Sequence, residues 1–243
     1  MMTLFTHCDS LKTAIESRRP LPEHTLKTLH QQWVLEWTYN SNAIEGNTLT
    51  LKETKVVLEG ITIGGKSMLE HFEVINHKEA IDYVEAVIAG GEFFSEHLIK
   101  SIHQLVLKNI DANNAGIYRR ENVLIAGAEH RPPDYLQVPG QMTALVQAYQ
   151  DFSGHPIERA ARLHVDFVKI HPFVDGNGRT ARLLMNFDLM KAGFLPVIFK
   201  AADRLAYYEA LDKAHTQNDY GDFLHLSAHA ETVALGNVLS LLG

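Results

Sequence analysis

The stretch HPFVDGNGRTAR, residues 171–182, decides how the chain folds around it. A residue that precedes proline disfavours helical backbone, so a helix is expected to end before Pro172. Gly176 and Gly178 allow a tight loop whose backbone can approach a ligand closely, because neither carries a side chain. A second helix is expected to begin near Asn177. The stretch therefore predicts two helices joined by a tight, ligand-facing loop.

The residue types in this loop suit nucleotide-dependent group transfer. Free backbone N–H groups at a helix N-terminus, aided by the helix dipole, form an anion site. Arg179 and Arg182 stand three apart on one side of the second helix, which suits a polyphosphate. Asp175 beside a phosphate is a natural ligand for Mg²⁺, which takes one or two carboxylates plus phosphate oxygens. His171 can act as a general base near neutral pH.

Each feature alone also has a simpler structural explanation. A Gly-Asn-Gly run is more often a turn than a phosphate-binding loop, and a histidine before proline is usually structural. Six chemically suitable residues within twelve positions make a joint coincidence the weaker hypothesis. The functional interpretation is therefore preferred.

Helical patterns surround the loop on both sides. Apolar residues recur at helical spacing, and Thr50–Glu53 and Ser67–Glu70 both have the form of a capping box that opens a helix. Pro156 is a good first-turn residue. The expected helices cover approximately residues 22–46, 51–60, 67–89, 95–109, 140–152, 156–170, 177–192, 202–216 and 221–241.

Residues 118–138 break the helical pattern. The β-prone run Val123-Leu124-Ile125 is followed by Gly127 and by two consecutive prolines, which forbid a regular helix. We interpret this segment as a small β-hairpin, called the flap below. The predicted class is all-α with one hairpin.

The stretch 171–182 resembles the signature loop of the Fic family, His-Pro-Phe-x-Asp-Gly-Asn-Gly-Arg-x-x-Arg, at every specified position. The resemblance covers roughly residues 116–228 and extends more loosely into the N-terminal half. Residues 116–119 are similar to the segment before the family's target-docking hairpin. The resemblance implies a Fic-type helical domain with the flap beside the loop. It also implies transfer of AMP from ATP to a Ser, Thr or Tyr hydroxyl of a target protein, or of the protein itself.

The resemblance assigns a role to each position of the loop. His171 would deprotonate the target hydroxyl, and Asp175 would hold Mg²⁺ against the phosphates. Phe173 would anchor the loop in the core. The anion hole would be formed by Gly176, Asn177 and Gly178, and the polyphosphate would be held by Arg179 and Arg182.

Two further regions acquire roles in the same way. Tyr207 and Tyr208, with Leu211 and Ala214, resemble the helix that lines the adenine pocket. The resemblance implies nucleotide binding by Tyr208 and His215, although His215 stands where relatives often place an asparagine. This departure leaves the base preference open. The residues expected to pair with an extended segment of the target are Asn122, Val123, Leu124 and Ile125.

The segment Ser41–Gly46, SNAIEG, resembles the family's inhibitory motif of Ser or Thr, three residues, Glu, and Gly or Asn. The resemblance implies that Glu45 pairs with Arg182 and removes its contact with the γ-phosphate. A glutamate at a helix end is the simpler explanation. We expect residues 1–94 to form an N-terminal helical region that carries this motif and packs on a catalytic core, residues 95–243.

Bulk properties narrow the class of protein. The chain has 243 residues, a formal net charge of −7 and a pI near 6.0, which disfavours nucleic-acid binding. A single cysteine excludes an internal disulfide, and no stretch approaches the roughly 20 apolar residues of a membrane span. We expect a cytoplasmic protein that binds neither nucleic acid nor membrane, and a homodimer stays open.

Two other patterns invite different functions. Residues 60–67, GITIGGKS, match the P-loop pattern, but the preceding residues carry helical spacing where that motif needs a strand. His225 and His229 have the four-residue spacing of metal ligands, without a third ligand to support them. We interpret Ser67 as a helix cap and the histidines as ordinary surface residues.

Three alternative activities remain to be separated. Family members that phosphorylate their targets carry altered residues in the Gly-Asn-Gly-Arg portion, which this sequence retains. In some relatives the inhibitory glutamate directs water to remove AMP from a modified protein. A third alternative is a nucleotide-sensing interaction module without turnover, against which the intact His171 argues.

Overall fold

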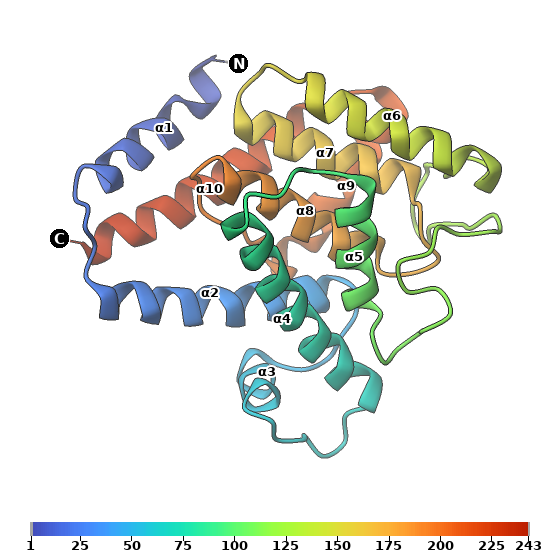
Figure 1. The fold of residues 1–243 in the computed structure, drawn as a ribbon, viewed down its shortest axis with the longest axis horizontal. Coiled ribbons are helices and arrows are strands. Elements are labelled where there is room, and N and C mark those ends of the chain that lie inside the picture. The colour runs from blue at the N-terminus through green and yellow to red at the C-terminus, as the bar shows by residue number, and fades with distance from the viewer. Residues whose placement is uncertain (1, 243) are drawn as a thin grey trace.

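A computed structural model describes residues 2–242, and within that range the chain is all-α (Figure 1). The helices are α1 (Met2–Glu16), α2 (Glu23–Ile44), α3 (Leu51–Leu58), α4 (Met68–Ala89), α5 (Glu96–Val106), α6 (Val138–Asp151), α7 (Pro156–Ile170), α8 (Asn177–Lys191), α9 (Arg204–Gln217) and α10 (Gly221–Leu241). Short 3₁₀ turns at Tyr135–Gln137 and Ala201–Asp203 lead into α6 and α9.

Local sequence signals explain where most of these helices begin. Thr50 and Ser67 cap α3 and α4, each in a complete capping box with the glutamate three residues later. Pro156 opens α7 as its first residue, where its missing N–H costs no helical hydrogen bond. Every helix predicted from the sequence is present within a few residues of its expected bounds. Helix α1 was missed.

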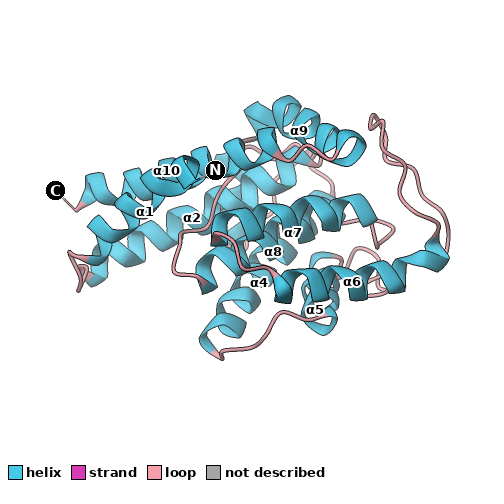
Figure 2. Ribbon diagram, turned by 90° about the horizontal axis from the view of Figure 1, so that it is seen from above, coloured by secondary structure: helices cyan, strands magenta, loops and turns pink. Residues whose placement is uncertain are grey.

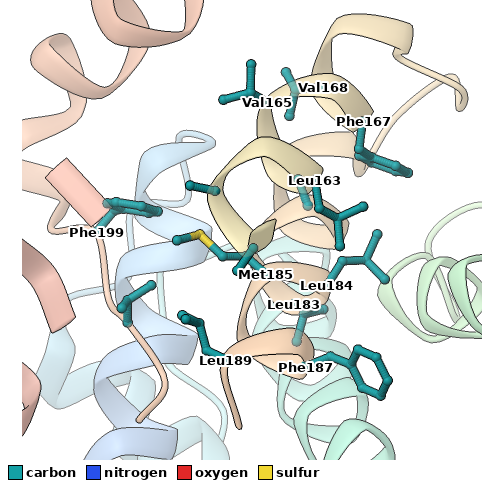
Figure 3. Close-up of a cluster of buried hydrophobic side chains, with 14 of the residues drawn as sticks. Leu163, Val165, Phe167, Val168, Leu183, Leu184, Met185, Phe187, Leu189 and Phe199 are labelled. Carbon is teal, nitrogen blue, oxygen red and sulfur yellow. The ribbon is translucent and has the colours of Figure 1, made fainter. Parts of the chain in front are cut away.

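The centre of the fold is the packed pair α7 and α8, which run side by side in Figure 1. Helix α8 is buried along almost its whole length, because other helices cover it on every side. Figure 3 shows apolar side chains of the two helices meeting between them, among them Leu163, Phe167, Leu183 and Met185. The loop 171–176 is therefore held between two rigid, fully packed helices.

The N-terminal helices share this core. One cluster of buried apolar side chains extends from Phe5 in α1 to Val238 in α10. Helix α1 packs on α10, and α2 packs on α4 and contacts α8 (Figures 1 and 2). A small separate cluster around Leu49, Val57 and Val74 fixes α3 to α4. Helix α2 is thus fixed in place by its packing against α4 and α8.

The predicted β-hairpin is not formed in the described residues, none of which is a strand (Figure 2). The flap runs as a loop, with Leu124 81% exposed. A hairpin needs a cross-strand ladder and one buried face, and neither Val123 nor Ile125 reaches the core. The flap is instead held at its base, where Asn122 accepts a hydrogen bond from the Tyr135 N–H at 2.8 Å.

The P-loop look-alike has a different structure from the motif it matches. The segment before it is α3, a helix and not a strand, as the sequence predicts. Lys66 donates to the Thr48 carbonyl at 2.7 Å, and the Ile63 N–H donates to His71. These contacts make residues 60–67 a connection between α3 and α4. None of the described helices is long and apolar enough to cross a membrane.

Candidate active site

The loop between α7 and α8 is bracketed by two residues in the left-handed backbone region. His171 ends α7 with φ 52° and ψ 59°, and Gly176 precedes α8 with φ 74°. A histidine rarely adopts this conformation, so the fold imposes strain at that position. Asn177 closes the loop, because its side chain accepts from the Phe173 N–H at 3.0 Å and donates to the Phe173 carbonyl at 2.9 Å.

The start of α8 has unpaired backbone donors that suit an anion. The backbone N–H groups of its first turn have no partner within the helix. Gly178 lies beside the carboxylate of Glu45, and a Cβ atom at this position would collide with that carboxylate. The side chain of Asn177 is committed to closing the loop, so only its backbone is left for a bound anion. The geometry therefore suits the anion hole that the sequence predicts.

His171 is half-buried and is held in a neutral state. Burial lowers the pKa of His171 to about 4, an effect that the nearby Val168 carbonyl partly opposes. The Arg119 guanidinium fixes the backbone here by donating through Nε to the His171 carbonyl at 2.9 Å. At neutral pH the ring is uncharged and can accept a proton.

Arg182 uses its donors on partners from the end of α2 and from α9. Its Nε donates to the Ser41 hydroxyl at 2.9 Å, and its Nη2 donates to the Ser41 carbonyl at 2.7 Å. The same Nη2 lies 2.7 Å from Oε1 of Glu45, so the contact predicted from the sequence is present. Its Nη1 donates to the Tyr207 hydroxyl at 3.2 Å, which lies 2.9 Å from Nε2 of His164.

Arg179 has a different environment from the one expected. Its Nη1 lies 3.0 Å from Oε1 of Glu73 and its Nη2 lies 3.1 Å from Oδ2 of Asp175. The guanidinium is only 3% exposed, whereas the Asp175 side chain is 63% exposed. Glu73 also accepts from the Asn47 side chain at 2.8 Å. In this structure Arg179 therefore orients a carboxylate and does not point into open space.

Asp175 suits a Mg²⁺ ion that also binds phosphate. Its carboxylate is exposed beside the anion site, and Oδ1 accepts from the Gly176 N–H at 2.6 Å. No group of three or more His, Cys, Asp or Glu residues that could hold a metal exists among residues 2–242. One carboxylate plus phosphate oxygens and water is an arrangement that Mg²⁺ accepts.

The expected adenine-pocket residues lie on α9. The Tyr208 hydroxyl donates to the Ile44 carbonyl at 3.0 Å, which joins α9 to the end of α2. His215 is buried, and its Nε2 lies 3.0 Å from the Val165 carbonyl, against the ring of His130. Burial lowers the pKa of His215 to about 4, so it is neutral at pH 7. Its Nε2 is already bonded to the backbone and is not free to read a base.

Sequence comparison places this site in a known family. The model of the Fic/DOC family matches residues 93–189, which include the whole loop. Fic-1 from C. elegans, a solved fragment, has a TM-score of 0.88 at 32% identity, over 99% of this chain and 73% of that fragment. The chain belongs to the Fic/DOC family. A Fic domain-containing signalling protein from Bacteroides thetaiotaomicron matches 98% of this chain with a TM-score of 0.89 and 29% identity.

Curated Fic relatives share the sequence over most of this chain. The protein adenylyltransferase Fic of Nematostella vectensis is 44% identical over 186 residues, which is 73% of this chain. That of Culex quinquefasciatus is 35% identical over 233 residues, or 92% of this chain. The match covers only 42% and 45% of these two relatives. The chain thus spans less than half the length of the curated Fic proteins it resembles.

Three residues of the site were not assigned roles from the sequence. Arg119 lies in a segment that resembles the family, but it received no role of its own. Glu73 and His103 carry no sequence signal, because polar residues are expected on amphipathic helices and nothing nearby in the sequence marks these two. Only the three-dimensional structure brings them to the loop: Glu73 contacts Arg179, and Nε2 of His103 lies 2.9 Å from the Asp175 carbonyl.

Proposed function

We propose that the protein is an adenylyltransferase that transfers AMP from ATP to a Ser, Thr or Tyr hydroxyl of a target protein. The observation that carries this proposal is the complete signature loop, in which a neutral histidine, an anion site and an exposed carboxylate lie together. The curated relatives are named protein adenylyltransferases and share 35–44% of their residues with this chain over the matched segments. ATP is accordingly the proposed nucleotide.

The loop can stabilise the transition state mainly through position and charge. Phosphoryl-type transfer develops charge on phosphate oxygens, which the N–H groups of α8 and Arg182 would receive. His171 would take the proton of the attacking hydroxyl, and the negative phosphates beside it would raise its pKa from the low value that burial imposes. Asp175 would hold Mg²⁺, which neutralises phosphate charge when bound.

We propose that Glu45 inhibits this transfer. Its carboxylate occupies Arg182 and lies beside Gly178, so ATP phosphates must compete with it for the same donors. The motif lies at the end of α2, in the region 1–94 that we propose as the inhibitory part. Residues 95–243 would form the catalytic core. The shared hydrophobic core supports a fixed placement of α2 against α8.

We propose that the flap binds the target in extended form. Val123, Leu124 and Ile125 form a β-prone run that lacks a partner strand in the described residues, and Leu124 is largely exposed. A target segment that adds a strand here would supply the missing backbone partners. Leu124→Pro should therefore reduce transfer to the target while ATP binding is unchanged.

The deciding experiment uses Glu45→Gly protein with cell lysate and ATP labelled at either the α- or the γ-phosphate. Label transferred from the α-phosphate alone means adenylylation, and label from the γ-phosphate means a kinase. Transfer of neither label, with ATP still bound, would leave a nucleotide-sensing module. His171→Ala in the same background is the control and should lower transfer by about 10²–10⁴-fold with ATP binding retained.

A further inference from the structure

His103 of α5 connects the signature loop to residues 116–119, which lead into the flap and are called the flap stem below. Its side chain is fully buried, and Nδ1 lies 2.9 Å from the Gly116 backbone nitrogen. On the other side of the ring, Nε2 lies 2.9 Å from the carbonyl oxygen of Asp175. A backbone N–H can only donate and a carbonyl can only accept, so the ring must be neutral with its proton on Nε2. The two partners thus fix the tautomer.

Packing fixes the position of the same ring. It stacks on Phe173 with centroids 3.5 Å apart and planes 3° from parallel. On its edge, a Cβ atom added at Gly176 would lie only 3.4 Å from Nε2. The ring therefore has hydrogen bonds at both nitrogens, an aromatic neighbour on one face and the loop backbone along its edge. Rotation or displacement would break several contacts at once.

Arg119 supplies the matching connection at the other end of the loop. Its backbone N–H donates to the Pro172 carbonyl at 2.9 Å, and its Nε donates to the His171 carbonyl. Its Nη2 donates to the Pro133 carbonyl at the return of the flap. Segment 116–119 is therefore tied to the start of the loop through Arg119 and to the end of the loop through His103.

We propose that His103 is a positioning residue that sets the Asp175 segment of the loop relative to the flap stem. This inference rests on the proposed AMP transfer for its kinetic consequence. The loop holds both the carboxylate and the anion site, whereas the flap would hold the attacking target. A shift of about 1 Å between them can cost on the order of 10²-fold in rate.

Two substitutions in the Glu45→Gly background separate the two hydrogen bonds. In His103→Gln the longer side chain can still donate to the Asp175 carbonyl, whereas in His103→Asn the shorter amide can accept only from Gly116. We expect kcat to fall by about 10–100-fold in His103→Asn and by less in His103→Gln, with the KM for ATP within about threefold. Ile99→Val, also buried on α5, is the control for lost stability.

A second measurement does not depend on activity. The ¹⁵N chemical shifts of His103 in the wild-type protein should show the Nε2–H tautomer, and the Gly116 amide should exchange faster in His103→Gln than in Ile99→Val. An Nδ1–H tautomer would overturn the proposal. So would a folded His103→Asn protein within twofold of the parent kcat, or two variants whose losses simply follow stability. A Glu45→Gly parent without α-label transfer would refute the proposed function, and the tautomer would still decide this inference.

Discussion

Arg179 and Arg182 stand one helical turn apart on α8, and each is paired with a glutamate from the N-terminal helices. Arg182 meets Glu45 at the end of α2, and Arg179 meets Glu73 on α4. Both guanidinium groups are almost fully buried, at 4% and 3% exposure. The two ion pairs therefore look alike when burial and distance are compared.

The two arginines differ in how their guanidinium nitrogens are shared among acceptors. Arg182 shares one nitrogen, Nη2, between Glu45 and the Ser41 carbonyl, so loss of the carboxylate leaves that nitrogen another acceptor. Arg179 gives one nitrogen to Glu73 and the other to Asp175, so each carboxylate holds one end of the guanidinium. This difference fits the proposed roles, in which Glu45 competes with a ligand and Glu73 supports Arg179 beside Asp175.

The largest expected effect follows from removing the competing carboxylate. Glu45→Gly should raise AMP transfer by at least about 10²-fold, because it frees Arg182 and lets ATP phosphates take their productive position. Arg182→Ala should not activate, since the phosphate loses its donor. The double variant should behave like Arg182→Ala. AMP transfer by the four proteins at one ATP concentration measures this, and equal activity of wild type and Glu45→Gly would show that Glu45 is only a helix end.

Removal of the supporting carboxylate should act in the opposite direction. Glu73→Gln leaves the buried Arg179 with a weaker partner, which should cost roughly 2 kcal/mol of unfolding free energy and lower transfer. Denaturant unfolding and transfer in the Glu45→Gly background provide the two measurements. Glu79→Gln is the matched control, because that residue lies on the same helix in an exposed pair with Lys108. Activation by Glu73→Gln would abolish the distinction between the two pairs.

Acid should lower the stability of the folded protein through two buried histidines near these arginines. Burial, with the charge of Arg182 nearby, lowers the pKa of His77 and of His164 well below the usual value, and Arg179 adds to the effect on His77. The unfolded chain then binds more protons below about pH 6.5, so stability falls as pH decreases from there toward the native pKa values. The limiting slope is about 1.4 kcal/mol per pH unit for each histidine.

Unfolding free energies measured between pH 7 and pH 5 test this slope. His77→Phe should lessen the loss of stability on acidification, when each protein is compared with its own stability at pH 7. His97→Gln, an exposed position on α5, should leave the slope unchanged. A slope that is the same in all three proteins would contradict the expected neutral state of His77.

The smallest expected effect concerns the Tyr207 hydroxyl, which accepts a hydrogen bond from Nη1 of Arg182. Tyr207→Phe removes the acceptor of Nη1 and the neighbour of His164, while Ser41 and Glu45 still hold the guanidinium. We expect a loss of about 1 kcal/mol in unfolding free energy. Tyr39→Phe on α2 is the control. Thermal unfolding of both variants checks the difference, and an unchanged Tyr207→Phe protein would mean that this hydroxyl does not stabilise Arg182.

Sequence patterns predicted the helices and the loop because these depend on local signals. Capping boxes, Pro156 and the glycines of the loop act within a few residues, so one sequence is enough to find them. Helix α1 was not predicted, because the arrangement of its apolar residues is explained only by its packing on α10. The flap was predicted as a hairpin from its β-prone run, but a run without a cross-strand partner stays a loop.

The site was predicted only as far as the family motif extends. The pairing of Glu45 with Arg182 followed from two motif segments. The roles of Glu73 and His103 could not follow, because each depends on a contact across more than 70 positions of the chain. Arg179 was expected to face phosphate, and its burial against Glu73 appears only when α4 is in place. Long-range polar contacts outside the two motif segments are thus what the sequence left undetermined.

The absence of a side chain at Gly178 has an evolutionary consequence. A methyl group there would collide with the Glu45 carboxylate and would lie 3.2 Å from Nη1 of Arg182. A substitution that expelled the glutamate would therefore also narrow the space in which a phosphate must approach the backbone. With the roles proposed above, a side chain at position 178 would therefore disturb both the inhibitory contact and the approach of phosphate. Unrestrained variants are expected to arise by loss of Glu45 itself, and not by drift at position 178.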